Sequence, residues 1–363
     1  MILGEASSTN YLLGFGLAFA VTAAATPVVR RYALRHGIVD APSEARKIHN
    51  HAVAYLGGVA IFAGFVAAVL ALLPASRQLG ALLLGCLILV SVGVVDDMRG
   101  LSPWVKLVFQ VLAACVALAG GIGITALTNP LGGTIDLTWG RTAFQLGGWH
   151  FHIMPLANSL SILWMVGLAN TINFLDGLDG LATGVSGIAA LVMFGLSVGP
   201  HVNQPAVAML AIILAGAALG FLPFNFFPAK VFMGDSGADF LGLCLAMLSI
   251  YSGAKLATAA LVLGFPIVDA LWAATRRIAR GESPFKADRR HFHHLLLDAG
   301  MSQRQAVVTL YAVAAAFGTV ALVVGSFAKL VALIVLTLTM AIAITLLVLR
   351  GYVVSRRTPS HNR

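Results

Sequence analysis

The sequence predicts an all-α integral membrane protein that crosses the bilayer many times. Hydrophobic residues make up 59% of the 363 residues and charged residues only 10%, whereas soluble domains contain about 45–50% apolar and about 25% charged residues. The apolar residues gather in runs of roughly 20, the length of a helix that spans the hydrocarbon core. What remains is enough for loops and ends but not for a large soluble domain, so we expect residues 1–363 to form a single membrane domain.

About eleven apolar runs are the expected transmembrane helices, and they lie near residues 11–29, 54–73, 79–95, 105–124, 156–174, 180–198, 205–222, 238–253, 256–274, 305–325 and 329–349. The first run resembles a cleaved signal peptide, because three consecutive alanines near its end look like a cleavage site. Signal peptides begin with basic residues, and residues 1–10 contain no Lys or Arg. We therefore expect the first run to be retained as a span.

The charged residues are distributed unevenly between the two sides that these spans define. All but four of the 23 Lys and Arg residues fall in loops 30–53, 96–106, 223–237 and 275–304 and in the basic tail 350–363. The positive-inside rule makes this side cytoplasmic, with the N-terminus in the periplasm and the C-terminus in the cytoplasm. All acidic residues except Glu5 and Asp136 lie on or near this side. We therefore expect the net charge of +9 to serve in binding anionic lipid and a phosphate-bearing substrate, and not nucleic acid.

The first cytoplasmic loop combines Asp40 with Arg46, Lys47 and His49. Its basic residues would serve equally as a positive-inside anchor or as contacts to a substrate phosphate. The second loop begins with Asp96 and Asp97, at the end of an apolar run. Two adjacent carboxylates at a membrane boundary are costly unless they meet a cation or water, and neighbours on a helix point about 100° apart, so the two are expected to have different roles.

The third polar cluster is the most informative: Asn170, Asn173, Asp176 and Asp179 recur at every third position between two apolar runs. On a straight helix four such positions sweep half the circumference, because each step of three rotates the side chain by about −60°. The glycines that follow the two aspartates must then break or bend the helix if the four side chains are to converge. Carboxylate and carboxamide oxygens suit Mg²⁺ or Mn²⁺, so this cluster predicts a metal-dependent site.

The fourth cluster contains Asn225, Lys230 and Asp235, and glycines flank the Asp235-Ser236 pair. Glycines there let the backbone approach a ligand closely. A lone loop carboxylate is usually only solvated, but Asp235 is expected on the same face as the other aspartates. We therefore assign it a role in binding metal.

The fifth loop holds Lys286, Arg289 and Arg290, followed by His291, His293 and His294. The His-x-His-His spacing without Cys or a following HExxH is unusual for catalytic zinc. Beside Lys and Arg, the histidines fit a binder of pyrophosphate oxygens and sugar hydroxyls better. Zinc binding and a solvated basic face are the alternatives.

The cysteines and the histidines of the external loop do not predict a functional site. Cys86, Cys115 and Cys244 are scattered in apolar runs, which argues against a disulfide framework or a thiolate metal site. His150 and His152 lie in the long external loop and are more simply structural than metal-binding. The carboxylate-rich face ringed by cations therefore indicates phosphoryl chemistry in which a water-soluble phosphorylated donor meets a lipid acceptor.

Four motifs in order between about residues 40 and 305 resemble the polyprenyl-phosphate N-acetylhexosamine-1-phosphate transferase family. They are Asp96-Asp97, the run from Asn170 to Asp179, Pro228-Ala-Lys-Val-Phe-Met-Gly-Asp235-Ser-Gly, and Asp288-Arg-Arg-His-Phe-His-His294. The His-rich loop is most similar to the bacterial undecaprenyl-phosphate α-N-acetylglucosaminyl 1-phosphate branch, and less similar to the muramoyl-pentapeptide branch.

The resemblance implies transfer of N-acetylglucosamine 1-phosphate from UDP-N-acetylglucosamine to undecaprenyl phosphate, with Mg²⁺ or Mn²⁺ and release of UMP. The product, undecaprenyl-pyrophosphoryl-N-acetylglucosamine, would begin O-antigen or a related surface glycan at the cytoplasmic face of a bacterial inner membrane. Direct attack by the lipid phosphate is favoured over a phosphorylated aspartate, because the phosphate needs at most one proton removed.

The resemblance also implies a role for each motif residue. Asp235 and Asn173 would ligate the metal, and Asp97, with Asp96, would take a proton from the lipid phosphate or orient it. Contacts to phosphates would come from Lys47, Lys106, Arg289 and Arg290. The nucleotide site would be shaped by Asp176, Asp179 and Asn225, and the sugar-pyrophosphate end by His291, His293 and His294.

Other functions stay open at this level. The same chemistry with another UDP-N-acetylhexosamine is one alternative, because epimer choice rests on a few hydrogen bonds. The aspartate-rich motifs also suit an intramembrane prenyltransferase, and membrane carboxylates suit a cation-coupled transporter. Asp239 and Asp269, in or near spans, have no assigned role, and the oligomeric state is open, a homodimer included.

Overall fold

Thirteen helices and three short β-hairpins make up the described part of the chain, which in this computed structural model is residues 8–40, 52–146, 149–200, 202–251, 256–282 and 291–357. The helices are α1 (Ser8–Arg35), α2 (Gly57–Leu72), α3 (Arg77–Arg99), α4 (Pro103–Ala119), α5 (Pro155–Leu175), α6 (Leu181–Val198), α7 (Pro205–Asn225), α8 (Gly234–Tyr251), α9 (Leu256–Val262), α10 (Gly264–Ala279), α11 (Phe292–Asp298), α12 (Gln303–Val323) and α13 (Ser326–Arg357). The hairpins pair β1 (Val39–Asp40) with β2 (Val53–Ala54), β3 (Ala126–Thr128) with β4 (Thr134–Asp136), and β5 (Thr142–Leu146) with β6 (Trp149–Ile153).

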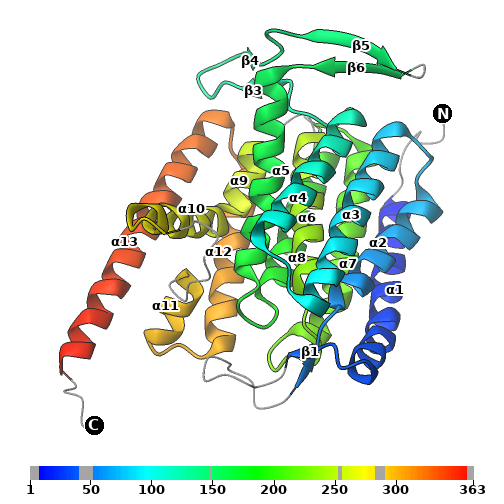
Figure 1. The fold of residues 1–363 in the computed structure, drawn as a ribbon. Helices are drawn as coiled ribbons and strands as arrows, with labels where there is room; N and C mark the ends of the chain where they lie inside the picture. Colours follow the sequence, from blue (N-terminus) through cyan, green and yellow to red (C-terminus); the bar gives the residue numbers. More distant parts are fainter. Residues whose placement is uncertain are drawn as a thin grey trace.

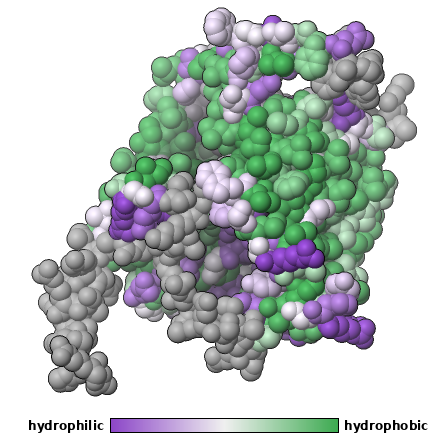
Figure 2. Space-filling view, viewed as in Figure 1, coloured by the Kyte–Doolittle hydropathy of each residue, from purple (hydrophilic) through white to green (hydrophobic). Residues whose placement is uncertain are grey.

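The predicted all-α membrane architecture is confirmed, since each of the eleven apolar runs is helical. Within the described residues, seven helices are long and apolar enough to cross a membrane, or eight if the bent pair α9–α10 is one span. Two further apolar helices, α2 and α4, are shorter, with 16 and 17 residues. The count of eleven spans and the orientation of the termini therefore stay predictions. Figure 2 shows hydrophobic side chains across the middle of the visible face, with hydrophilic residues toward both ends.

The run at 256–274, expected as one span, consists of two helices. Helix α9 ends at Val262, α10 begins at Gly264, and their axes differ by 81°. Pro266 explains the break, because proline has no N–H to donate and its ring clashes with the carbonyl four residues earlier, that of Val262. As a result α10 runs across the other helices (Figure 1), and Asp269 and Arg277 lie beside α11 instead of along a vertical span.

Helix α8 lies at the centre of the bundle, with its side chains buried from Ser236 to Ile250. Two glycines let neighbouring helices touch its first turn. A Cβ on Gly58 of α2 would lie 2.1 Å from the backbone nitrogen of Gly237, and a Cβ on Gly93 of α3 would lie 2.3 Å from the Cα of Ser236. The start of α8 is thus held between α2 and α3 by backbone contact.

The loops that carry the predicted site meet at one end of the bundle. The β5–β6 hairpin covers the opposite end, while β1, α11 and the connections α3–α4, α5–α6 and α7–α8 gather at this one (Figure 1). The first loop is tied to the fourth, because Ala54 of β2 forms a parallel bridge with Val231. The shared face predicted for the aspartates is therefore present.

Candidate functional site

Asp97 joins the end of α3 to the beginning of α8. Its Oδ1 accepts a hydrogen bond from the backbone N–H of Asp235 at 2.8 Å, and its Oδ2 accepts one from the Ser236 hydroxyl at 2.8 Å. Gly234 makes this approach feasible, because its φ is +70° and a Cβ there would lie 2.4 Å from Asp97 Oδ2. Asp97 therefore caps α8 and fixes the backbone of Asp235.

Lys106, in the first turns of α4, is the cation that the neighbouring carboxylates meet. Its ammonium donates to Asp96 Oδ2 at 3.3 Å and also to Asp235 Oδ2. Asp96 accepts a second hydrogen bond, from the backbone N–H of Leu101 at 2.5 Å. Asp96 and Asp97 thus have different partners, as predicted from their positions on the helix. The Asn173 side chain lies beside the Asp235 carboxylate, so the two predicted metal ligands lie together.

The oxygen donors around Lys106 suit a hard cation. Mg²⁺ is commonly held by one or two carboxylates while water and substrate phosphates fill its other positions. Asp96, Asp235 and Asn173 offer that set. Among the described residues, no group of three or more His, Cys, Asp or Glu side chains could enclose a metal ion by itself. The chemistry of these oxygen donors therefore fits a hard divalent cation.

The predicted break in the third cluster is confirmed. Helix α5 ends at Leu175, Asp176 is its C-cap, and α6 starts after Gly180, whose φ of +81° favours glycine. This turn leaves Asp176 at the edge of the carboxylate cluster. Loss of contact with water, followed by repulsion from Asp235, Asp97 and Asp179, raises the pKa of Asp176 well above its ordinary value.

Asp179 and Asn225 hold the fourth loop in place. Asp179 Oδ2 accepts a hydrogen bond from the Ala229 backbone N–H at 2.9 Å. Asn225 donates to the Val231 carbonyl at 3.1 Å and accepts from the Thr183 hydroxyl at 2.8 Å. Both side chains are buried, and neither lines the cavity described next. They contribute to the site through the loop that leads to Asp235.

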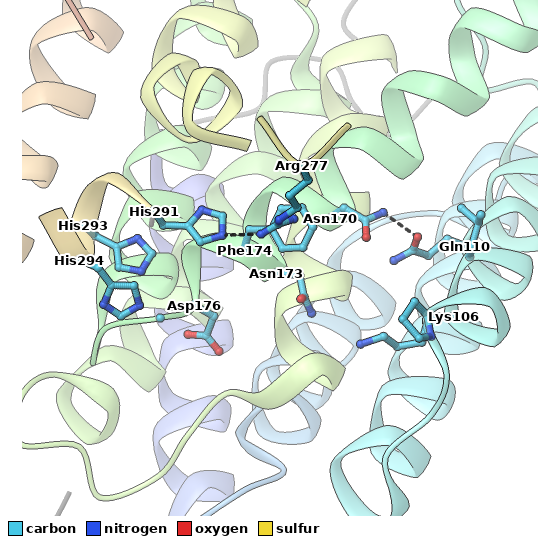
Figure 3. A pocket seen from close by; sticks show the side chains of 13 residues that line it. Lys106, Gln110, Asn170, Asn173, Phe174, Asp176, Arg277, His291, His293 and His294 are labelled. Atoms are coloured by element: carbon cyan, nitrogen blue, oxygen red, sulfur yellow. Dashed lines mark hydrogen bonds between the residues drawn. The ribbon is translucent and has the colours of Figure 1, made fainter. Parts of the chain in front are cut away.

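A cavity of about 320 Å³ lies beside the carboxylates. It brings together side chains from four helices and from the turn after α5, as Figure 3 shows. Its lining comprises Pro103, Lys106, Leu107, Gln110, Asn170, Asn173, Phe174, Asp176, Gly177, Arg277, His291, His293 and His294. Most of the predicted site residues within the described chain therefore converge on one space, with Lys106 on one side and the histidines on the other (Figure 3).

The histidines are packed against each other and against the end of α5. The rings of His291 and His293 are parallel within 5°, with centroids 5.7 Å apart, and His294 lies 4.4 Å from His293. Gly177 makes room for them, because a Cβ there would lie 2.3 Å from His293 Nε2. Burial, together with the neighbouring His294 and His291, lowers the pKa of His293 well below its ordinary value. His293 is therefore a neutral ring near pH 7, suited to hydrogen bonds with hydroxyl groups.

Sequence reasoning missed two residues of the cavity. Arg277 is buried, with its guanidinium 5.7 Å from the centroid of Phe174. It falls in the expected loop 275–304, whereas the structure places it on α10, after the break at Pro266. A Gly-x-Pro in an apolar run is a signal for such a break. Gln110 was the single amide in an otherwise apolar run. Its Oε1 accepts from Asn170 at 2.7 Å.

Three predicted site residues lie outside the described chain. They are Lys47, in segment 41–51, and Arg289 and Arg290, in segment 283–290.

Comparison with known proteins gives consistent matches. The family model described as glycosyl transferase family 4 matches residues 79–253, a stretch that runs from the first turn of α3 to the end of α8 and includes the aspartates of the cluster. A probable undecaprenyl-phosphate N-acetylglucosaminyl 1-phosphate transferase of Bacillus subtilis is 36% identical over 310 residues, which cover 83% of this chain and 81% of the relative. A decaprenyl-phosphate N-acetylglucosaminephosphotransferase of Mycobacterium tuberculosis is 35% identical over 323 residues, which cover 80% of this chain and 76% of the relative. An undecaprenyl-phosphate alpha-N-acetylglucosaminyl 1-phosphate transferase of Yersinia pestis is 28% identical over 331 residues, which cover 86% of this chain and 82% of the relative.

Proposed function

Because the chain belongs to the polyprenyl-phosphate N-acetylhexosamine-1-phosphate transferase family, we propose that it transfers N-acetylglucosamine 1-phosphate from UDP-N-acetylglucosamine to undecaprenyl phosphate. The products are undecaprenyl-pyrophosphoryl-N-acetylglucosamine and UMP. The observation that carries this proposal is the cavity lined by Lys106, Asp176, Arg277 and the histidines, next to which Asp96 and Asp235 bind the Lys106 ammonium. Membership of the family leaves the prenyltransferase and transporter alternatives without support.

We assign the histidine side of the cavity to the donor. Neutral His293 and its neighbour His294 suit sugar hydroxyls, and the Arg277 guanidinium suits a pyrophosphate oxygen. Asp176, Asp179 and Asn225 are proposed to shape the nucleotide site, the last two by holding the loop before Asp235.

The phosphates of both substrates need cations, because their negative charges would otherwise repel each other. We assign contacts with them to Lys106 and, from the loops outside the described chain, to Lys47, Arg289 and Arg290. Lys106 already stands between two carboxylates, so a substrate phosphate can draw its ammonium away from Asp96 or Asp235.

We propose that Asp235 and Asn173, with Asp96 nearby, hold Mg²⁺ or Mn²⁺. The ion supplies charge neutralisation on the donor pyrophosphate and the acceptor phosphate. Asp97 fixes the position of Asp235 through the cap on α8.

We assign removal of the proton from the acceptor phosphate to the pair Asp96 and Asp97. Asp97 uses both oxygens to hold the start of α8, whereas Asp96 shares Lys106 with Asp235 at the rim of the site. Asp96 is therefore the member of the pair with better access to the lipid phosphate, which it would deprotonate or orient for direct attack on the donor. Asp97 contributes negative charge and the geometry of the cap.

We place this end of the bundle in the cytoplasm of a bacterial inner membrane, following the distribution of basic residues. UDP-sugars would then reach the site from the water side and the lipid phosphate from the bilayer. The product would be the first lipid-linked intermediate of O-antigen or a related surface glycan.

The proposal is tested by UMP release from purified protein in detergent. The donors are UDP-N-acetylglucosamine and UDP-N-acetylgalactosamine, and the acceptors are undecaprenyl and decaprenyl phosphate. Release that requires both a polyprenyl phosphate and Mg²⁺ or Mn²⁺, with faster turnover of the glucosamine donor and the undecaprenyl acceptor, is the expected result. Folded protein that releases no UMP from either donor would overturn it.

A further inference from the structure

We propose that Asp269 is a positioning residue that acts through His291 and α11 to hold the histidines of the cavity against the donor. The identity of the donor rests on the proposed function. The contact between α10 and α11 does not depend on the proposed function, so the contact and the donor assignment can be tested separately.

Asp269 is the link between the bent helix pair and the histidine segment. It lies on α10 with 5% of its surface exposed. Its Oδ2 accepts a hydrogen bond from His291 Nδ1 at 2.9 Å, and its Oδ1 accepts one from the backbone N–H of Phe292 at 2.8 Å. His291 is the N-cap of α11 and has no side-chain capping bond of its own. A residue of α10 therefore performs the capping of α11.

Only a carboxylate satisfies both donors. The Phe292 backbone always presents an N–H, and His291 presents Nδ1 to the second oxygen. An asparagine has one acceptor and one NH₂ group, so with its oxygen on the Phe292 N–H it would place the NH₂ against His291 Nδ1, which can accept only if the ring proton moves to Nε2, toward the Arg277 N–H groups. A buried donor without an acceptor costs about 1–3 kcal/mol. The geometry therefore requires the acid at this position and not merely a polar residue.

The same contact fixes the tautomer of His291. With its proton on Nδ1 and donated to Asp269, the ring leaves Nε2 as an acceptor for the Arg277 guanidinium, whose Nη2 lies 3.4 Å away. The opposite tautomer would turn an N–H toward the Arg277 N–H groups. Asp269 thus orients His291, and His291 in turn meets an arginine that lines the cavity.

The orientation of His291 extends to the other histidines. His293 and His294 are the second and third residues of α11, and His293 lies parallel to His291. Helix α11 has only seven residues, so it has little stability of its own and depends on its attachments. Loss of the Asp269 contacts would let the histidine rings shift, and a misplacement of about 1 Å at an active site can cost about 100-fold in rate.

The test compares Asp269→Asn and Asp269→Ala with the control Asp298→Asn. Asp298 is exposed at the last position of α11, so the control changes the same kind of charge on the helix itself. The readouts are amide hydrogen exchange of residues 291–298, the KM for the UDP-sugar and the KM for the lipid phosphate. We expect faster exchange in both Asp269 variants, more so in Asp269→Ala, and a rise in the donor KM of about tenfold. The lipid KM should stay within about twofold of wild type, which a general loss of stability would not produce.

A double-mutant cycle tests whether Asp269 acts through His291. The expected donor KM of Asp269→Asn combined with His291→Ala is the same as that of His291→Ala alone, since coupled residues are not additive. Effects that multiply would overturn the proposed route. Unchanged exchange and unchanged donor KM in the folded Asp269→Asn protein would overturn the positioning role.

The exchange measurement separates this inference from the proposed function. If wild-type protein releases no UMP, faster exchange of α11 in the Asp269 variants still supports the contact between α10 and α11, while the donor assignment fails. Unchanged exchange would overturn the contact whatever the enzyme assay gives.

Discussion

Asp97 Oδ1 accepts a hydrogen bond from the backbone N–H of Asp235 at 2.8 Å, so the end of α3 caps the beginning of α8. The two aspartates therefore meet through a carboxylate and a backbone amide, while the Asp235 carboxylate is free to face Lys106 and Asn173. This arrangement connects the fold to the chemistry, because the helix that lies at the centre of the bundle begins inside the site.

Asp97→Asn should separate capping from catalysis. The asparagine Oδ1 can still accept from the Asp235 N–H, and its NH₂ can donate to the Ser236 oxygen, so α8 stays capped. We expect thermal stability close to wild type and UMP release reduced at least 100-fold, because the negative charge is gone. Asp97→Ala should also lose about 1 kcal/mol of stability with the cap.

The matched control for the Asp97 variants is Asp136→Asn. Asp136 is exposed in β4, and its side chain accepts from the local Thr138 N–H at 2.8 Å. Its substitution should leave UMP release unchanged. Wild-type turnover in Asp97→Asn would remove the charge of Asp97 from the mechanism.

Lys106→Met should expose the repulsion between the carboxylates that Lys106 bridges. Without the ammonium, Asp96 and Asp235 retain like charges at close range. We expect a lower melting temperature in the absence of divalent ions, and a larger increase on adding Mg²⁺ or Mn²⁺ than wild type shows. Thermal unfolding in detergent with and without each ion measures both effects. Equal metal-induced shifts in the two proteins would contradict a metal at this position.

Gly177→Ala should displace His293. The new Cβ would lie 2.3 Å from His293 Nε2 in the present arrangement, so the ring must move. We expect donor affinity to fall about tenfold, by the loss of about 1.4 kcal/mol of binding free energy. Gly167→Ala is the control, because a Cβ at that position of α5 meets nothing within 4 Å. Equal donor affinity in the two variants, measured by titration with UDP-N-acetylglucosamine, would count against the role of His293.

His293 should also make the protein less stable in acid. Burial lowers its pKa in the folded state well below its ordinary value, so between the two pKa values the unfolded chain binds more protons than the folded one. Stability therefore rises with pH through this window and is lost as the pH falls below about 6.5. His293→Gln should show a smaller decrease in melting temperature between about pH 7 and pH 5. The same decrease in both proteins would place the acid sensitivity elsewhere.

The sequence predicted the site better than the path of the helices that build it. The shared face of Asp97, Asp176 and Asp235 followed from the alternation of apolar runs and charged loops, and the break after Leu175 followed from the geometry of a three-residue repeat. Both depend on local patterns that a single chain displays. The bend at Pro266 is also local, but this proline lies inside an apolar run that has the length of a span, so composition and length alone predict a single helix there.

The partners of buried polar residues could not be predicted in this way. Asp269 appeared as an isolated acid in an apolar run, and only the turn of α10 across the bundle brings it to His291. Asp179 and Asn225 were expected to shape the nucleotide site, and the sequence does not show that their hydrogen-bond partners lie in the loop between α7 and α8. The Asp269–His291 and Asp179–Ala229 pairings join residues 22 and 50 positions apart, and they depend on tertiary packing that periodicity does not encode.

The most direct test of the central claim follows the phosphate that is attached to the sugar. Purified protein is given UDP-N-acetylglucosamine labelled with ³²P at that phosphate, together with undecaprenyl phosphate and Mg²⁺. Transfer of the sugar 1-phosphate predicts that the label enters the lipid extract while unlabelled UMP is released, and that omitting either lipid or metal prevents both. Label that stays in water as UDP while the sugar enters the lipid would contradict the account.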